Sequence, residues 1–184
     1  MTAIAYAAAI RPNAARLGLV LGLTLVLAAS ARVSVPFWPV PMTLQTLAVL
    51  TIAGLAGPRL AVAAMLAYLL EGTLGLPVFA GTPERGIGLA YLAGPTGGYL
   101  FGMVLAAAVV GGLARRAAAR PWALLGVMTL GSVLVYAVGA AWLAQYVGAS
   151  RAVALGVVPF LAGDAIKTAL AATLVLAAGR LRRA

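Results

Sequence analysis

Asp164 and Lys167 are the two residues best suited to do chemistry in this chain of 184 residues. They lie three positions apart in the sequence PFLAGDAIKT, residues 159–168, so a helix would present both side chains on one face. Charged groups inside an apolar segment are costly to bury and are usually functional. The residues alone leave three interpretations open: a structural ion pair, a binding site for a polar ligand, or a carboxylate that relays protons.

Few other side chains could take part in catalysis. The chain has no cysteine and no histidine, and its only other carboxylates are Glu71 and Glu84. These absences exclude a thiolate nucleophile, an imidazole general base and a zinc site of the usual kind. Three scattered carboxylates also form no acid–base or metal cluster. We therefore predict that the protein is not an enzyme and has no cofactor of its own.

Polar and aromatic residues elsewhere could complete a ligand site. Gln45 lies near the start of an apolar segment, where its amide needs a partner on another helix or on a ligand. Residues 35–41 contain three prolines, which favour a stiff extended path. Trp38 in this segment could cover an apolar ligand or anchor the chain at the membrane interface. Arg85 could bind a carboxylate or be solvated.

Small residues recur at intervals of four near the start of the chain, at Ala14, Gly18 and Gly22. Such a stripe allows another helix to approach closely, and the residues alone favour a partner within the same bundle over another protein.

The composition assigns the chain to a membrane. Hydrophobic residues make up 64% of it, charged residues 9%, and the mean hydropathy is +1.09, whereas a soluble domain carries about 25% charged residues. A spanning helix needs about 20 apolar residues. We predict an all-α membrane protein that forms a single domain over residues 1–184 and has six transmembrane helices. Their expected bounds are 14–30, 43–56, 59–74, 96–114, 122–147 and 159–179, and residues 75–95 form a long external loop.

The basic residues predict the orientation of these helices. Nine arginines fall at one set of helix ends: Arg11, Arg16, Arg59, Arg115, Arg116, Arg120, Arg180, Arg182 and Arg183. Only Arg32, Arg85 and Arg151 fall at the opposite ends. Because cytoplasmic loops are rich in Arg and Lys, we predict that both termini are cytoplasmic and that the protein spans the cytoplasmic (inner) membrane several times. The net charge of +10 then reflects topology, and we expect no nucleic-acid partner.

This orientation places three unusual segments at the external face: residues 35–41, 75–95 and 158–167. A site assembled from them opens outward. The glycines of the external loop are not followed by the Lys-Ser or Lys-Thr of a phosphate-binding loop, so we predict no nucleotide site in the chain.

Four motifs together resemble a known family. They are VPFWPVPMTLQTL (35–47), GLPVFAG (75–81), GPTGGYL (94–100) and PFLAGDAIK (159–167). In this order they look like BioY, the biotin-binding S component of energy-coupling-factor (ECF) vitamin transporters. The resemblance implies the six-helix S-component fold, a biotin site near the external face, and two kinds of partner: a transmembrane coupling protein and ATP-hydrolysing subunits.

The resemblance also implies roles for individual residues. Asp164 and Lys167 would bind the polar groups of biotin, and Arg85 is the candidate for its carboxylate. An Asp oxygen can accept from the ureido N–H groups and Lys can donate to the ureido carbonyl, while the thiophane ring needs apolar walls. The remaining substrate-binding candidates are Gln45, Trp38, Phe79 and Tyr91, and the docking candidates for the coupling protein are Ala14, Gly18 and Gly22.

Biotin capture for an ECF transporter is thus the function that the sequence predicts. Two alternatives remain: an S component for another vitamin, and a self-sufficient secondary transporter driven by an ion gradient.

Overall fold

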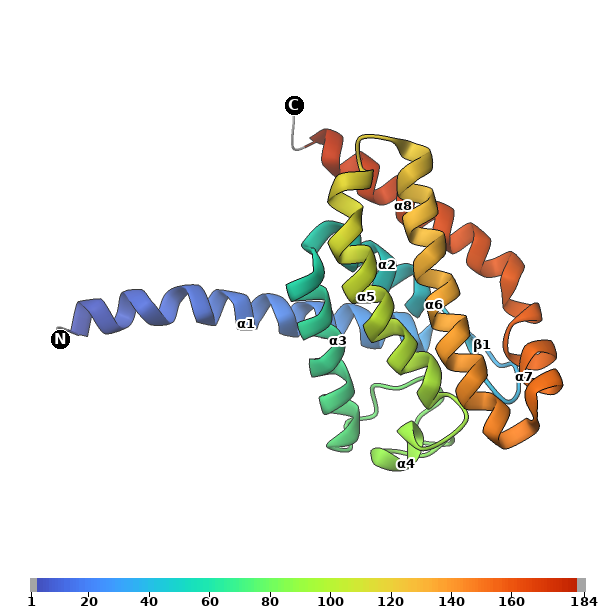
Figure 1. Ribbon diagram of the computed structural model, residues 1–184. Helices are drawn as coiled ribbons and strands as arrows, with labels where there is room; N and C mark the ends of the chain where they lie inside the picture. Colours follow the sequence, from blue (N-terminus) through green and yellow to red (C-terminus); the bar gives the residue numbers. More distant parts are fainter. Residues whose placement is uncertain (1–2, 182–184) are drawn as a thin grey trace.

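The computed structural model describes the backbone of residues 3–181 and the side chains of residues 14–181, and it is almost entirely helical (Figure 1). The helices are α1 (Ala3–Arg32), α2 (Gln45–Ala56), α3 (Pro58–Thr73), α4 (Leu89–Leu92), α5 (Gly97–Ala117), α6 (Pro121–Val147), α7 (Ala149–Gly156), the 3-10 helix η1 (Val158–Phe160) and α8 (Leu161–Leu181). Two short strands, β1 (Ser34–Val35) and β2 (Met42–Thr43), pair antiparallel between α1 and α2. This hairpin is an addition to the predicted all-α architecture.

Helices α5 and α6 lie side by side and form the most closely packed pair of the bundle (Figure 1). Glycines on α5 make this possible. A Cβ atom on Gly102 would lie 2.8 Å from the Cα of Val135, and one on Gly98 would lie 2.1 Å from the Cβ of Trp142. Without side chains at these positions the two backbones approach closely, as small residues allow between membrane helices.

The α5–α6 contact can be tested with Gly102→Ala. The added methyl group meets the backbone of α6, which must shift, so we expect a loss of about 1–3 kcal/mol of stability. Gly112→Ala on the same helix is the matched control, because a Cβ there meets nothing within 4 Å. Thermal unfolding in detergent should give a lower midpoint for Gly102→Ala and no decrease for Gly112→Ala. Equal midpoints would show that the contact does not require glycine.

A tight turn at residues 57 and 58 joins α2 to α3. Helix α2 ends at Ala56, Gly57 has a φ of +79°, and Pro58 is the first residue of α3. Glycine adopts a positive φ without strain, and proline suits the first turn of a helix. Gly111 of α5 lies directly beneath this turn, since a Cβ there would be 2.6 Å from the Pro58 nitrogen.

Four helical segments are long and apolar enough to cross a membrane: Ala14–Arg32, Gly97–Ala117, Pro121–Val147 and Ala149–Leu181. Helices α2 and α3 are shorter than the usual span of about 20 residues, so the count of six spans remains a prediction. The last expected helix, 159–179, begins instead at Leu161. Pro159 lies in η1, and the preceding α7 was not predicted. Proline cannot continue an α-helix from the preceding turn, which explains the break.

Helix α1 runs across the bundle and contacts α2 and α3 (Figure 1). Its buried Thr24 donates a hydrogen bond to Oε1 of Glu71 on α3, at 2.8 Å. Ala14, Gly18 and Gly22 are exposed, and a Cβ on either glycine would meet nothing within 4 Å. The expectation that the sequence favours, packing of this stripe inside the bundle, is therefore wrong. Small residues permit close packing, but among the described residues no atom lies within 4 Å of a Cβ placed on Gly18 or Gly22.

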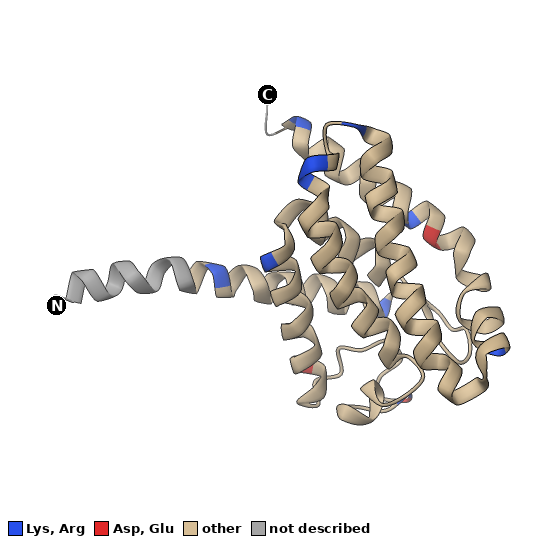
Figure 2. Ribbon diagram, in the orientation of Figure 1, with Lys and Arg blue, Asp and Glu red and all other residues tan. Residues whose placement is uncertain are grey.

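Arginines are concentrated at one end of the bundle, with fewer basic residues at the other (Figure 2). Arginines gather where α5 ends, α6 begins and α8 reaches the C-terminus, whereas the β hairpin, the loop with α4, and α7 lie at the other end. This distribution agrees with the predicted grouping for Arg59, Arg115, Arg116, Arg120 and Arg180. It does not hold for Arg16, because the first part of α1 projects from the side of the bundle. Arg11, Arg182 and Arg183 lie outside the residues whose side chains are described. The membrane side on which each end lies remains a prediction.

Candidate binding site

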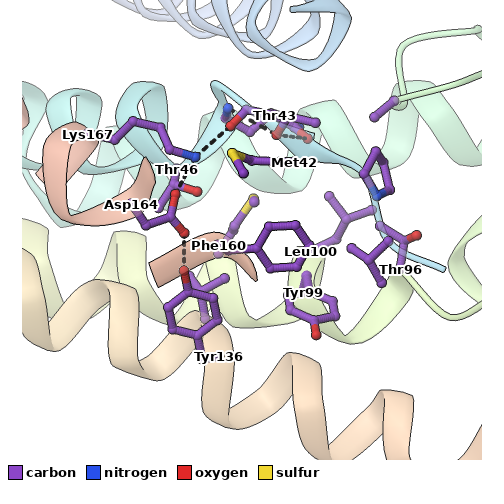
Figure 3. Close-up of a pocket in the computed structure, with 16 residues that line it drawn as sticks. Met42, Thr43, Thr46, Thr96, Tyr99, Leu100, Tyr136, Phe160, Asp164 and Lys167 are labelled. Atoms are coloured by element: carbon purple, nitrogen blue, oxygen red, sulfur yellow. Dashed lines mark hydrogen bonds and ion pairs between the residues drawn. The ribbon is translucent and has the colours of Figure 1, made fainter. Parts of the chain in front are cut away.

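A pocket lies between the β hairpin and helices α2, α5, α6 and α8 (Figure 3). It is next to the end of the bundle that holds the β hairpin, the loop with α4, and α7, which we call the loop end. The space between its atoms measures about 480 Å³, which includes space open to solvent. Asp164, Lys167 and Gln45 all line it, as the sequence analysis expects. Asp164 and Lys167 lie at one end of the pocket and Thr96 at the other.

Asp164 and Lys167 form an ion pair at the polar end of the pocket. The two residues are only 7% and 6% exposed. Lys167 also donates from Nζ to the backbone oxygen of Thr43 in β2, at 2.8 Å, and the Tyr136 hydroxyl of α6 donates to the Asp164 carboxylate. The charges are thus compensated by each other and by hydrogen bonds, which is how ionisable groups persist at membrane depth.

A second polar contact joins α6 and α8 one helical turn away. The hydroxyls of Ser132 and Thr168 are hydrogen-bonded at 2.9 Å and are buried. Ser132 lies four positions before Tyr136 on α6, and Thr168 lies four positions after Asp164 on α8. The two contacts together set the register of α8 against α6, and so the position of the Asp164 carboxylate.

The buried side-chain amide of Gln45 has a hydrogen-bond partner on another helix. Its Nε2 donates to the Tyr68 hydroxyl at 2.9 Å, and that hydroxyl donates to the Val78 carbonyl at 3.0 Å. The backbone N–H of Gln45 donates to the Thr43 hydroxyl at 3.2 Å, which holds the start of α2. These bonds connect the pocket to the loop through α3.

Apolar side chains form the middle of the pocket. Its walls are Met42, Leu100, Met103, Val135, Phe160 and the ring of Tyr99. Phe160 is also packed edge-on against Phe37 of the proline-rich segment, with ring centroids 5.7 Å apart. Polar groups at one end and apolar walls beside them suit a small ligand that has both hydrogen-bonding and apolar parts.

A second hollow adjoins the pocket at Thr96, which lines both. Arg85, Trp38 and Tyr91 line this second hollow. The Arg85 guanidinium donates to two backbone oxygens of the proline-rich segment, those of Pro39 and Phe37, both at 2.9 Å. Arg85 is therefore neither simply solvated nor inside the main pocket. It holds the proline-rich segment and keeps further N–H donors for a ligand, since a guanidinium has five.

Trp38 and Tyr91 differ in their surroundings. Trp38 is 73% exposed at the rim of the second hollow, a position compatible with both roles considered for it. Tyr91 is buried and donates to the Ala80 carbonyl at 2.9 Å. Burial raises the pKa of the Tyr91 hydroxyl, which keeps it protonated as a donor.

Phe79 lines neither the pocket nor the second hollow. It is 1% exposed, stacks on Tyr91 with centroids 4.7 Å apart, and fills the space over Gly72. The structure thus corrects its expected role: the ring packs beneath the loop and supports it. Aromatic residues of a loop motif look alike in sequence whether they contact a ligand or the loop itself.

Sequence reasoning missed four residues that shape the site: Tyr136, Tyr68, Tyr99 and Arg32. The first three are tyrosines within apolar segments, and buried hydroxyls need partners. Their occurrence there was the available signal. Arg32 ends α1 and donates to the Thr82 and Pro77 carbonyls, which ties α1 to the loop.

A comparison with known protein families covers all the residues that line the pocket. The model of the BioY family matches residues 5–184. The chain belongs to the BioY family.

Two individual relatives carry the BioY name, and a similar solved structure is an S-component for biotin. A probable biotin transporter BioY from Pyrococcus horikoshii is 39% identical over 152 residues, covering 83% of this chain and 86% of the relative. The biotin transporter BioY from Thermotoga maritima is 41% identical over 155 residues, covering 83% and 89%. A crystal structure of the S-component for biotin from an ECF-type ABC transporter superposes with a TM-score of 0.79 at 25% identity, covering 100% of this chain and 95% of that one.

Proposed function

We propose that this chain is the biotin-capture subunit of an ECF-type transporter. The observation that carries the proposal is the buried Asp164–Lys167 pair, which faces an apolar slot in a protein of the BioY family. The pocket is assembled by one chain, so binding requires neither a partner nor a nucleotide. The protein is a membrane transport component and not an enzyme.

The polar end of the pocket matches the ureido ring of biotin. That ring offers two N–H donors and one carbonyl acceptor. Asp164 can accept from an N–H, and Lys167 can donate to the carbonyl. Tyr136 and the Thr43 carbonyl hold these two side chains in place before the ligand arrives, which lowers the ordering cost of binding.

The rest of biotin would then lie along the pocket towards the loop. The thiophane ring fits between Phe160, Leu100 and Met103, and the valerate chain points past Thr96 into the second hollow. Arg85 lines that hollow and can receive the carboxylate in a charge-assisted contact. The loop lies at the end opposite the arginine-rich end, and by the positive-inside rule we infer that the site opens to the outside.

Thermal unfolding with a set of vitamins tests the proposal. At a hundredfold excess over its dissociation constant, biotin should stabilise the purified chain by about 2.7 kcal/mol. Lipoate is the matched control, because it shares the pentanoate tail and a sulfur ring but lacks the ureido group. We expect biotin to raise the midpoint and lipoate, riboflavin and thiamine to leave it unchanged. A shift with riboflavin or thiamine alone would assign the chain to another vitamin.

A further inference from the structure

The arginine-rich end of the bundle has no acidic side chain to neutralise it. Five exposed arginines with described side chains lie there: Arg59, Arg115, Arg116, Arg120 and Arg180. The chain has only three carboxylate side chains. Glu71 and Glu84 belong to the loop end, and Asp164 is paired with Lys167 in the only ion pair among residues 14–181. Among the described residues, no side chain supplies a counter-charge at this end, which leaves these arginines open to an anionic ligand.

A groove runs between two of these arginines. It consists of two adjoining hollows that share Ala118, Val175 and Gly179, with about 430 and about 580 Å³ of space between their atoms. Arg115 lines one hollow and Arg180 lines the other. The remaining lining comes from small and apolar side chains of α2, α5, α6 and α8. The groove thus combines two guanidinium groups with an apolar floor.

The surroundings of the groove place it where lipid headgroups meet hydrocarbon. It lies where α5 and α8 end and α6 begins, and all three belong to segments long enough to span a bilayer. Trp122, on the first turn of α6, is 82% exposed, and tryptophan concentrates at headgroup depth. Guanidinium groups bind phosphate oxygens in pairs of parallel hydrogen bonds.

We propose that this groove binds one anionic phospholipid. Its phosphate group lies against Arg115 and Arg180, and an acyl chain follows the apolar floor past Gly179. A zwitterionic lipid fits less well, because its own positive headgroup charge leaves the arginines without net compensation. The site is separate from the vitamin pocket, at the opposite end of the bundle, so it does not depend on the substrate.

Native mass spectrometry of the purified full chain tests this site. Phosphatidylglycerol and phosphatidylcholine with the same acyl chains are added at equal concentration. We expect phosphatidylglycerol adducts on the wild type to exceed phosphatidylcholine adducts at least threefold. The double variant Arg115→Gln/Arg180→Gln should lose this preference, while Arg151→Gln, an exposed arginine on α7 at the loop end, should retain it.

A second variant tests whether lipid binding needs the groove itself and not only the positive charge at this end of the bundle. A Cβ on Gly179 meets nothing within 4 Å, so we expect Gly179→Leu to place its side chain in the groove, and thermal unfolding of the variant checks that the fold is kept. The variant should also reduce phosphatidylglycerol adducts. Equal adducts of the two lipids on the wild type, or full retention in either groove variant, would overturn the proposal. Displacement of the lipid by an equal concentration of inorganic phosphate would do the same, because it would indicate a site for free anions.

Discussion

Purified protein with Asp164→Asn is expected to bind biotin more than tenfold more weakly than the wild type, and Lys167→Met should behave in the same way. Each change removes a charged hydrogen-bonding partner of the ureido ring, a loss of more than about 1.5 kcal/mol. Isothermal titration calorimetry measures it directly. Glu84→Gln and Arg151→Met are matched controls, since they make the same kinds of chemical change at exposed positions.

Loss of folding must be separated from loss of binding. Each single change leaves the other charge buried without its partner, which costs about 3–5 kcal/mol in comparable pairs. The double variant Asp164→Asn/Lys167→Met removes both charges. We therefore expect it to recover thermal stability relative to the single variants without recovering biotin affinity. If both single variants titrate like the wild type, the pair takes no part in binding and biotin binds elsewhere.

ATP-dependent uptake of biotin is expected to be lost in Gly18→Leu/Gly22→Leu, although the purified variant should bind biotin normally. The sequence contains no phosphate-binding loop motif, so we expect the accumulation of biotin to depend on a partner ATPase. The two glycines lie on an exposed face of α1 with open space around them, so leucine should not disturb the fold. Bulky side chains there would hold a partner helix of the coupling protein away from α1.

Copurification and transport in liposomes measure this effect. The coupling protein and ATPase subunits should copurify with the wild type and not with the double leucine variant. Gly126→Leu is the control, since it adds the same side chain at an open position on α6. If the purified chain alone concentrates biotin in sealed liposomes with an ion gradient and no ATP, it is instead a secondary transporter. If the leucine variant no longer binds biotin, the glycines are needed for the fold.

Features encoded within one or two helical turns were predictable from the sequence alone. The spacing of Asp164 and Lys167 places them on one face of any helix, and the structure confirms that both line the pocket. The turn at Gly57 and Pro58 depends only on the backbone preferences of those two residues, and it is also present. The long apolar spans follow from composition. The order of the four motifs indicated the BioY family, which the comparisons confirm.

Contacts between distant segments were decided by the tertiary structure. Asp164 meets Tyr136 and Lys167 meets the Thr43 carbonyl, across 28 and 124 positions of the chain. No local pattern indicates which tyrosine or which carbonyl becomes the partner. Phe79 and Tyr91 illustrate the same limit, because the same kind of aromatic side chain can face a ligand or pack beneath a loop.

The exposed glycines of α1 show most clearly that the sequence alone does not determine what a helix face contacts. A stripe of small residues has the same sequence whether it packs inside its own bundle or binds another protein. Only the path of α1 across α3 leaves Gly18 and Gly22 uncovered. A helix's own hydrogen bonds depend on neighbouring residues, and sequence therefore predicts where helices form. What covers each face depends on how all the helices pack together, and that arrangement is a property of the whole fold.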